Sequence, residues 1–159
     1  MREKELHSEI EIGASAERVW GILTDFASYP RWNPFIRSIG GELEVGERLE
    51  VRLEPPDSRG ITMRPTVLRV EPNRLMRWLG RLLVPRLFDG EHSLAIHLLG
   101  EDRVRFVQHE AFKGVLVPLV ARTLDNTLRG FEEMNGALKE RAEALPESIN
   151  LRTSESLHG

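Results

Sequence analysis

The chain has 159 residues, of which 40% are hydrophobic and 30% charged, and its formal net charge is −3. This length suits one domain with a single hydrophobic core. A chain with this charge has no basic surface to neutralise phosphates, so we expect no nucleic-acid partner. The sequence contains no cysteine, which excludes disulfides, thiolate metal ligands and cysteine nucleophiles. The lack of cysteine fits a reducing compartment, and we expect a cytoplasmic protein.

No segment has the composition of a membrane anchor. The N-terminal residues Met-Arg-Glu-Lys-Glu contain no apolar h-region, so they do not resemble a secretory signal. No uninterrupted apolar run approaches the roughly 20 residues of a spanning helix. We therefore expect no stable membrane insertion.

The first elements are a strand and a short helical region. Residues 5–12 alternate, with Leu6, Ser8, Ile10 and Ile12 on one face, which predicts a half-buried strand. Ser15 is a typical helix N-cap, and apolar residues recur at helical spacing after it, at Val19, Trp20, Leu23 and Phe26. Residues 29–34 contain two prolines and predict a kinked connector.

Six further strands are predicted in the middle of the chain. They cover about 35–43, 47–54, 60–71, 74–82, 90–99 and 103–112. Short segments rich in Gly, Pro, Asn and Asp separate them. These connections are too short for parallel crossovers, so the sheet should be antiparallel.

The pattern changes to a helical one from about 115 to 145. A single apolar stripe runs along this segment: Val120, Leu124, Thr127, Leu128, Phe131, Met134, Leu138, Ala142 and Leu145. This spacing predicts a long amphipathic helix with one buried face, ended by Pro146. We expect one domain over residues 1–146 and a disordered tail at 147–159, where apolar residues are few.

These elements predict an α+β architecture. About seven antiparallel strands with one apolar face must cover the stripe of the long helix, and a curved sheet wrapped around that helix achieves this. Two short helices after the first strand would close one end. The order of these elements resembles that of the helix-grip fold.

Several segments also resemble one superfamily in sequence. Residues 15–26 and 29–35 resemble its opening helical region, residues 87–92 and 109–114 its late strands, and residues 130–139 the close of its last helix. The superfamily is the SRPBCC or START-like group, which includes birch-pollen-type allergens, and the resemblance is to its bacterial polyketide cyclase/dehydrase-like branch. The resemblance implies the helix-grip fold. Its members include lipid carriers, hormone receptors, aromatase/cyclases, chaperone co-activators and quinone-binding proteins, so it implies no single function.

The two late strands carry the clearest candidate site. Val104, Phe106, Gln108, Glu110 and Phe112 share one face, as do His92, Leu94, Ile96 and Leu98. If 100–102 is a three-residue loop, Leu98 pairs with Val104, and the same register then places His92 opposite Glu110. A slip of one residue would turn every side chain to the other face. The sequence therefore predicts a His92–Glu110 pair on the concave face, with Gln108 nearby.

Three roles are open for this pair. A carboxylate that orients an imidazole can serve as a general acid and base, as a cyclase or dehydratase requires. The two groups can instead hydrogen-bond the polar end of a ligand, or they can simply satisfy each other, as buried polar groups must. His7, His97 and His109 fall on outward faces, so only two groups converge and we expect no metal. We also expect no other cofactor.

The leading hypothesis is a binding or carrier protein for a small hydrophobic or aromatic molecule, lipid- or polyketide-like. The ligand would lie between the sheet and the last helix. The predicted ligand-binding residues are Trp32, Met63, Trp78, His92, Leu94, Phe106, Gln108, Glu110, Phe112 and Phe131. Methionine and aromatic side chains line apolar pockets, but they also fill cores. The alternatives are a cyclase or dehydratase that uses His92 and Glu110, and an interaction module of the chaperone co-activator or quinone-associated kind. A homodimer is also possible.

Overall fold

The computed structural model describes residues 3–81 and 87–144, and the predicted tail at 147–159 and Leu145 lie outside them. The strands are β1 (Glu3–Ile12), β2 (Ile36–Gly40), β3 (Glu50–Leu53), β4 (Ile61–Met63), β5 (Thr66–Glu71), β6 (Leu75–Arg81), β7 (Asp89–Gly100) and β8 (Arg103–Lys113). The helices are α1 (Ala16–Thr24), α2 (Tyr29–Trp32) and α3 (Ala121–Glu143), with 3₁₀ turns at Phe26–Ser28 and Val117–Leu119.

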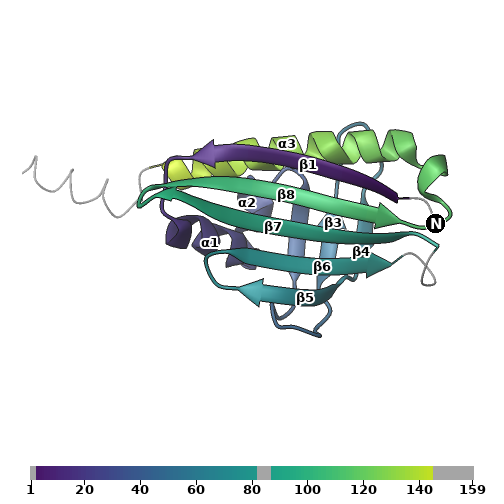
Figure 1. The fold of residues 1–159 in the computed structure, drawn as a ribbon, viewed down its shortest axis with the longest axis horizontal. Coiled ribbons are helices and arrows are strands. Elements are labelled where there is room, and N and C mark those ends of the chain that lie inside the picture. Colours follow the sequence, from purple (N-terminus) through teal and green to yellow (C-terminus); the bar gives the residue numbers. More distant parts are fainter. Residues whose placement is uncertain (1–2, 82–86, 145–159) are drawn as a thin grey trace, which may run out of the picture.

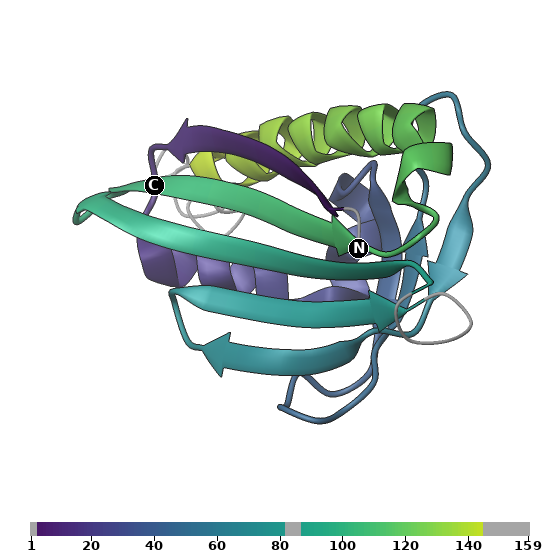
Figure 2. The same ribbon diagram turned by 45° about the vertical axis from the view of Figure 1, so that its right-hand side comes forward.

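The described strands form two antiparallel sheets. Five strands pair in the order β1-β8-β7-β6-β5, and three pair in the order β2-β3-β4. Figure 1 shows α3 running along the β1 edge of the larger sheet. In the same view, the smaller sheet lies behind the larger one. The turned view shows that the larger sheet curves around the space between these layers (Figure 2). The α+β helix-grip prediction is thereby confirmed.

Prolines account for two differences from the predicted elements. The strand expected over 60–71 is divided into β4 and β5, with Arg64 and Pro65 between them; proline cannot donate a ladder hydrogen bond. The long helix begins at Ala121 rather than near 115, because Pro118 lies in the preceding 3₁₀ turn.

Arg18 ties the first helix to the last. Its backbone N–H donates to the Ser15 side chain at 3.2 Å, which is the predicted N-cap. Its guanidinium donates to the backbone oxygens of Ala142 and Ala144 at the end of α3. These carbonyl groups have no partner inside the helix, so Arg18 satisfies them and fixes that end of α3 against α1.

The predicted pairing of β7 and β8 is present. Leu98 pairs with Val104, Leu94 with Gln108, and His92 with Glu110. The connection differs from the three-residue loop, since Gly100 pairs with Arg103 and the register shifts between Leu98 and Gly100. A two-residue turn with a bulge therefore gives the same inner face as the predicted loop.

The buried face of α3 forms the centre of the core. Phe131, Met134 and Leu138 have no exposed surface, and Phe35 packs against Phe131 with ring centroids 5.5 Å apart. Gly130 makes this approach possible. A Cβ atom at Gly130 would lie 2.4 Å from Phe35 Cδ2, whereas a Cβ atom at Gly136 would meet no atom within 4 Å.

We therefore expect opposite effects from two alanine substitutions in α3. Alanine favours a helix over glycine by up to about 1 kcal/mol, and Gly136→Ala should gain part of this. Gly130→Ala should lower the free energy of unfolding by about 1–3 kcal/mol, because the fully packed Phe35 ring cannot move away cheaply. Urea unfolding of both variants measures the difference. Equal stabilisation by the two variants would contradict this packing.

Candidate functional site

A pair of glycines opens a cavity on the concave face. Gly80 of β6 pairs directly with Gly90 of β7. A Cβ atom at Gly80 would lie 2.4 Å from Met63 Cε, and one at Gly90 would lie 2.9 Å from Glu110 Oε2. Side chains at these two positions would occupy the space that Met63, Glu110 and Phe112 surround. The glycines leave a cavity of about 330 Å³.

The cavity lies between β3–β4, the ends of β6–β8 and the first turns of α3. Its lining residues are Arg48, Leu53, Pro55, Ile61, Thr62, Met63, Arg64, Gly80, Arg81, Phe88, Gly90, Glu110, Phe112, Leu124 and Thr127. A smaller space of about 20 Å³ adjoins it and shares Leu53, Met63, Gly80, Gly90 and Glu110. That volume holds about one water molecule. Aliphatic and aromatic side chains supply most of the exposed wall of the larger cavity.

The predicted ligand-binding residues divide into three groups. Met63, Glu110 and Phe112 line the larger cavity. Trp78 and His92 line the small adjoining space. The remaining five line neither of these two cavities: Trp32, Leu94, Phe106, Gln108 and Phe131. Packing explains most of them, since Leu94, Phe106 and Phe131 are fully buried and Trp32 packs on Tyr29 with ring centroids 5.2 Å apart.

The predicted ligand-binding residues omit most of the cavity wall, including Gly80, Gly90 and Leu124. A signal for the two glycines was present. Gly80 follows Met76 and Trp78 at alternate positions, and Gly90 precedes His92 and Leu94 in the same way. Glycine at inner-facing positions of two neighbouring strands marks a surface that side chains do not fill.

A chain of hydrogen-bonded side chains crosses the inner face toward α3. His92 Nε2 lies 3.0 Å from Gln108 Oε1. Gln108 Nε2 donates to Asn135 Oδ1 at 2.8 Å and to the Phe131 backbone oxygen at 3.3 Å. Asn135 Nδ2 in turn donates to Ser8 Oγ at 3.0 Å. Strands β1, β7 and β8 are thus joined to the long helix by polar contacts.

These contacts identify which nitrogen of the neutral His92 ring carries the proton. The Phe131 carbonyl can only accept a hydrogen bond, so the amide nitrogen of Gln108 must face it. The amide oxygen of Gln108 then faces His92 and accepts from Nε2–H. In the neutral ring, Nδ1 is therefore the acceptor, and it lies on the side of Glu110.

His92 and Glu110 are close, but they do not form a direct hydrogen bond. His92 Nδ1 lies 3.7 Å from Glu110 Oε1, beyond the usual limit. The ring of His92 is instead held by Gln108 and by stacking on Phe131, with centroids 4.9 Å apart. The predicted role of the carboxylate in orienting the imidazole therefore belongs to Gln108.

Burial keeps both groups uncharged near neutral pH. The side chains of His92 and Glu110 are 5% and 13% exposed. Desolvation raises the pKa of Glu110 to about 8. Burial also lowers the pKa of His92 to about 4, although the hydrogen bond with Gln108 opposes part of that shift. At neutral pH the site therefore holds a neutral imidazole beside a protonated carboxyl group that lines the cavity.

The other predicted histidines face outward. The side chains of His7 and His109 are 54% and 37% exposed, and His97 is also exposed. Over residues 3–81 and 87–144, no three His, Asp or Glu side chains are grouped as metal ligands. No helix of the same ranges has the length and apolar composition needed to cross a membrane.

Replacing Glu110 by Gln should remove a specific pH dependence of stability. With a folded pKa near 8 and an ordinary value of 4.5, the wild type binds more protons folded than unfolded. The contribution of Glu110 to stability is therefore complete below pH 4.5 and falls as the pH rises toward 8. Above about pH 6.5, His92 contributes little, since its own shift acts between 6.5 and 4.

The measurement is urea unfolding of wild type and Glu110→Gln at several pH values from about 6.5 to 9. Relative to the variant, the wild type should lose about 1–2 kcal/mol over this range, at about 1.4 kcal/mol per pH unit until the carboxyl ionises. Parallel profiles would show that Glu110 is ionised in the folded chain.

The comparisons with known proteins agree with this architecture. The sequence profile described as "Polyketide cyclase / dehydrase and lipid transport" matches residues 4–143. No curated protein matches the chain at a significant level of similarity.

Solved structures of the same fold include three with named activities or families. A START superfamily protein from Mycobacterium smegmatis has 23% identity and a TM-score of 0.67, over 87% of this chain and 97% of that one. The Zhui aromatase/cyclase from Streptomyces sp. R1128 has 16% identity and a TM-score of 0.67, over 89% and 94%. Norcoclaurine synthase from Thalictrum flavum has 17% identity and a TM-score of 0.67, over 87% and 86%.

The TM-scores establish a shared fold, and the profile spans almost all of the described residues. The chain therefore belongs to the polyketide cyclase/dehydrase and lipid transport family and has the helix-grip fold of the START-like superfamily.

Proposed function

We propose that the protein binds a small hydrophobic or aromatic molecule in the cavity between the sheet and α3. The observation that carries this proposal is the cavity itself, about 330 Å³ in volume. Ligand pockets usually measure roughly 300–1,000 Å³, so this one suits a small ligand. A one- or two-ring aromatic compound or a short acyl chain has suitable dimensions.

The wall chemistry supports an apolar ligand with one polar group. Leu53, Met63, Phe88, Phe112 and Leu124 supply aliphatic and aromatic surface. Several protein elements maintain this surface, since β3, β4, β8, α3 and Phe88, just before β7, all contribute. A ligand that displaces water from such a surface gains hydrophobic free energy in proportion to the area buried.

Glu110 is suited to orient the ligand. Its carboxyl group lines both cavities, and no hydrogen-bond donor from the described residues contacts it. A protonated carboxyl group can donate to a carbonyl oxygen or accept from a hydroxyl group. We propose that this interaction binds the one polar atom at the inner end of the ligand.

The family supports this proposal in general terms. Its description combines cyclase or dehydrase activity with lipid transport, and both require an apolar molecule to be enclosed. The proposed binding function therefore requires only that the cavity holds such a molecule. It is the same whether or not a reaction follows.

Filling the cavity should weaken ligand binding. Gly80→Val places a branched side chain against Met63, inside the cavity. We expect this variant to bind the fluorescent probe N-phenyl-1-naphthylamine at least about 10-fold more weakly than the wild type, which corresponds to about 1.4 kcal/mol. A fluorescence titration measures the affinity, and circular dichroism confirms that the variant folds.

Gly100→Val is the matched control. It makes the same substitution in β7, where a Cβ atom would meet nothing within 4 Å. Its affinity for the probe should equal that of the wild type. A wild type that does not bind the probe, or a Gly80→Val variant that binds it normally, would refute the proposed site.

One observation favours an enzyme as a second candidate. Glu110 lines the cavity and is protonated near neutral pH, as a general acid in a dehydration must be. His92 lines only the small space behind it. In a dehydratase or cyclase of this geometry, Glu110 would therefore contact the substrate, and His92 would lie behind it in the small space.

This alternative is tested with a β-hydroxy ketone such as 4-hydroxy-4-phenylbutan-2-one, whose dehydration produces a conjugated enone with strong ultraviolet absorbance. An enzyme of this kind should lose about 100-fold or more of its turnover in Glu110→Gln, with the fold and the binding of N-phenyl-1-naphthylamine retained. Equal turnover by the variant and the wild type would exclude Glu110 as the acid.

A further inference from the structure

Three arginines gather where the cavity opens to solvent. Arg48, Arg64 and Arg81 line the cavity together. The same three residues line an open groove of about 460 Å³ on the other side, with Thr66, Leu68 and Leu79. They therefore separate the apolar interior from the surface at the junction of the two sheets. This junction is marked by the isolated bridge between Arg48 and Thr66.

The arginines carry more charge than their partners neutralise. Arg64 Nη2 lies 3.2 Å from Glu50 Oε2, and Arg81 Nε lies 3.8 Å from Asp89 Oδ2. The Arg48 side chain donates to the Arg64 backbone oxygen at 3.3 Å, and it forms no ion pair within residues 3–81 and 87–144. The Arg64–Glu50 pair is exposed at both ends, and ion pairs of this kind are worth little and rearrange readily. The cluster can therefore bind an additional anion.

The only acidic residue that lines the cavity within the described ranges is Glu110, and it is uncharged near neutral pH. The carboxylates nearest the mouth, Glu50 and Asp89, are paired with Arg64 and Arg81, which leaves Arg48 as the arginine without an ion pair among the described residues. Guanidinium groups are well suited to carboxylate, sulfonate and phosphate, because they present several donors in one plane.

Glu110 and the three arginines form two polar regions of the cavity wall, and these lie at different levels along the sheet. Glu110 lies at the level of His92 and Trp78, which pair in register, and Arg81 is three residues further along β6. At about 3.3 Å per residue the backbones of Glu110 and Arg81 are about 10 Å apart along the sheet, and the Glu110 carboxyl group extends from its strand toward Gly90, which pairs with Gly80. The surface between these levels is apolar, with Met63, Phe88 and Phe112.

From this arrangement we infer that the ligand is an amphipathic anion, with its acidic group on Arg48, Arg64 and Arg81 and its apolar body in the cavity. The inference rests on the proposed binding function and names its ligand class. The ligand is an aromatic or short aliphatic compound that carries one carboxylate, sulfonate or phosphate group at the end that faces the mouth of the cavity.

Two matched probes test this inference. 8-Anilinonaphthalene-1-sulfonate and N-phenyl-1-naphthylamine share one ring system, and only the first carries a sulfonate group. The wild type should bind the sulfonate at least about 10-fold more tightly at low salt, and this preference should decrease as salt is added, because exposed charges are screened. In the double variant R48Q/R64Q, the ratio of the two affinities should fall about 10-fold.

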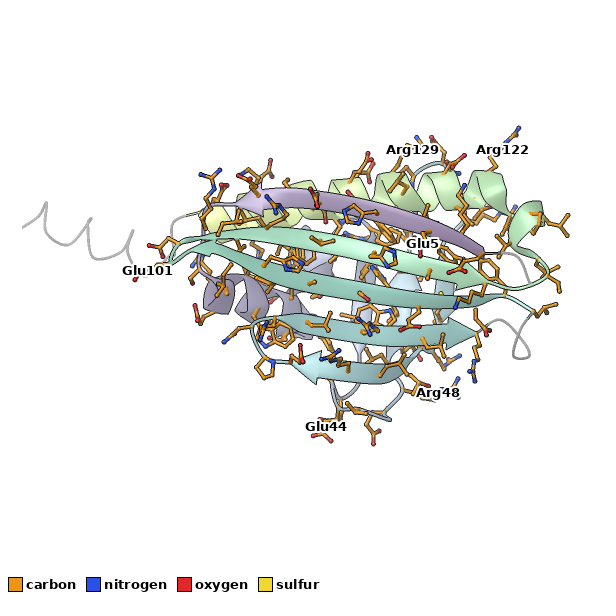
Figure 3. All side chains as sticks on the ribbon, viewed as in Figure 1. Glu5, Glu44, Arg48, Glu101, Arg122 and Arg129 are labelled. Carbon is orange, nitrogen blue, oxygen red and sulfur yellow. The ribbon has the colours of Figure 1, made fainter. Side chains whose placement is uncertain are left out.

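R122Q is the control. Arg122 is exposed on α3, and Figure 3 shows it on the opposite side of the molecule from Arg48. The R122Q variant should show the same ratio of affinities for the two probes as the wild type. Thermal unfolding checks that each variant folds, and R48Q alone replaces the double variant if that protein is unstable.

The outcomes separate the two proposals. A wild type that binds both probes equally, or an R48Q/R64Q variant that keeps the full preference for the sulfonate, would overturn the anionic ligand and leave the apolar cavity standing. A wild type that binds neither probe would instead contradict the proposed function itself. A preference that R122Q also loses would show that net charge, rather than the arginine cluster, selects the probe.

Discussion

Gln108 joins the sheet to the long helix by hydrogen bonds as well as by packing. It is fully buried, so both ends of its amide need partners. Its nitrogen reaches Phe131 and Asn135 on α3, and its oxygen reaches His92 on the neighbouring strand. The helix register, the strand register and the direction of the imidazole are therefore fixed together. A shift of any one of them would leave a buried polar atom without a partner, at a cost of about 1–3 kcal/mol.

The cavity begins where this well-packed region ends. On one side of His92, the inner face is filled by Leu94, Ile96 and Phe106, all buried. On the other side, Gly80 and Gly90 pair without side chains, and the space remains open. Glu110 lies at the boundary. Its carboxyl group is desolvated by the packed side and faces the open side, which explains how burial can raise its pKa while the group still lines the cavity.

A gradient of polarity runs through this part of the molecule. The inner end of the cavity offers a neutral carboxyl group, the middle offers apolar surface, and the mouth offers three guanidinium groups. Such an arrangement would orient an amphipathic molecule before any reaction occurred. Binding and catalysis in this family can therefore share the same geometry, because both need one defined direction of the ligand.

The sequence by itself determined the order of elements, the antiparallel sheet, the single helical stripe and the pairing of His92 with Glu110, because alternation and helical spacing are local properties of a chain. It did not determine which buried residues line a space. Phe106 and Phe112 lie on the same face of β8, yet the first is solid core and the second lines the cavity. That difference depends on what the opposing elements supply: side chains against Phe106, and glycine against Phe112. The arginine cluster likewise combines residues from three segments, and only the tertiary structure brings these together, since their spacing in the chain follows no period.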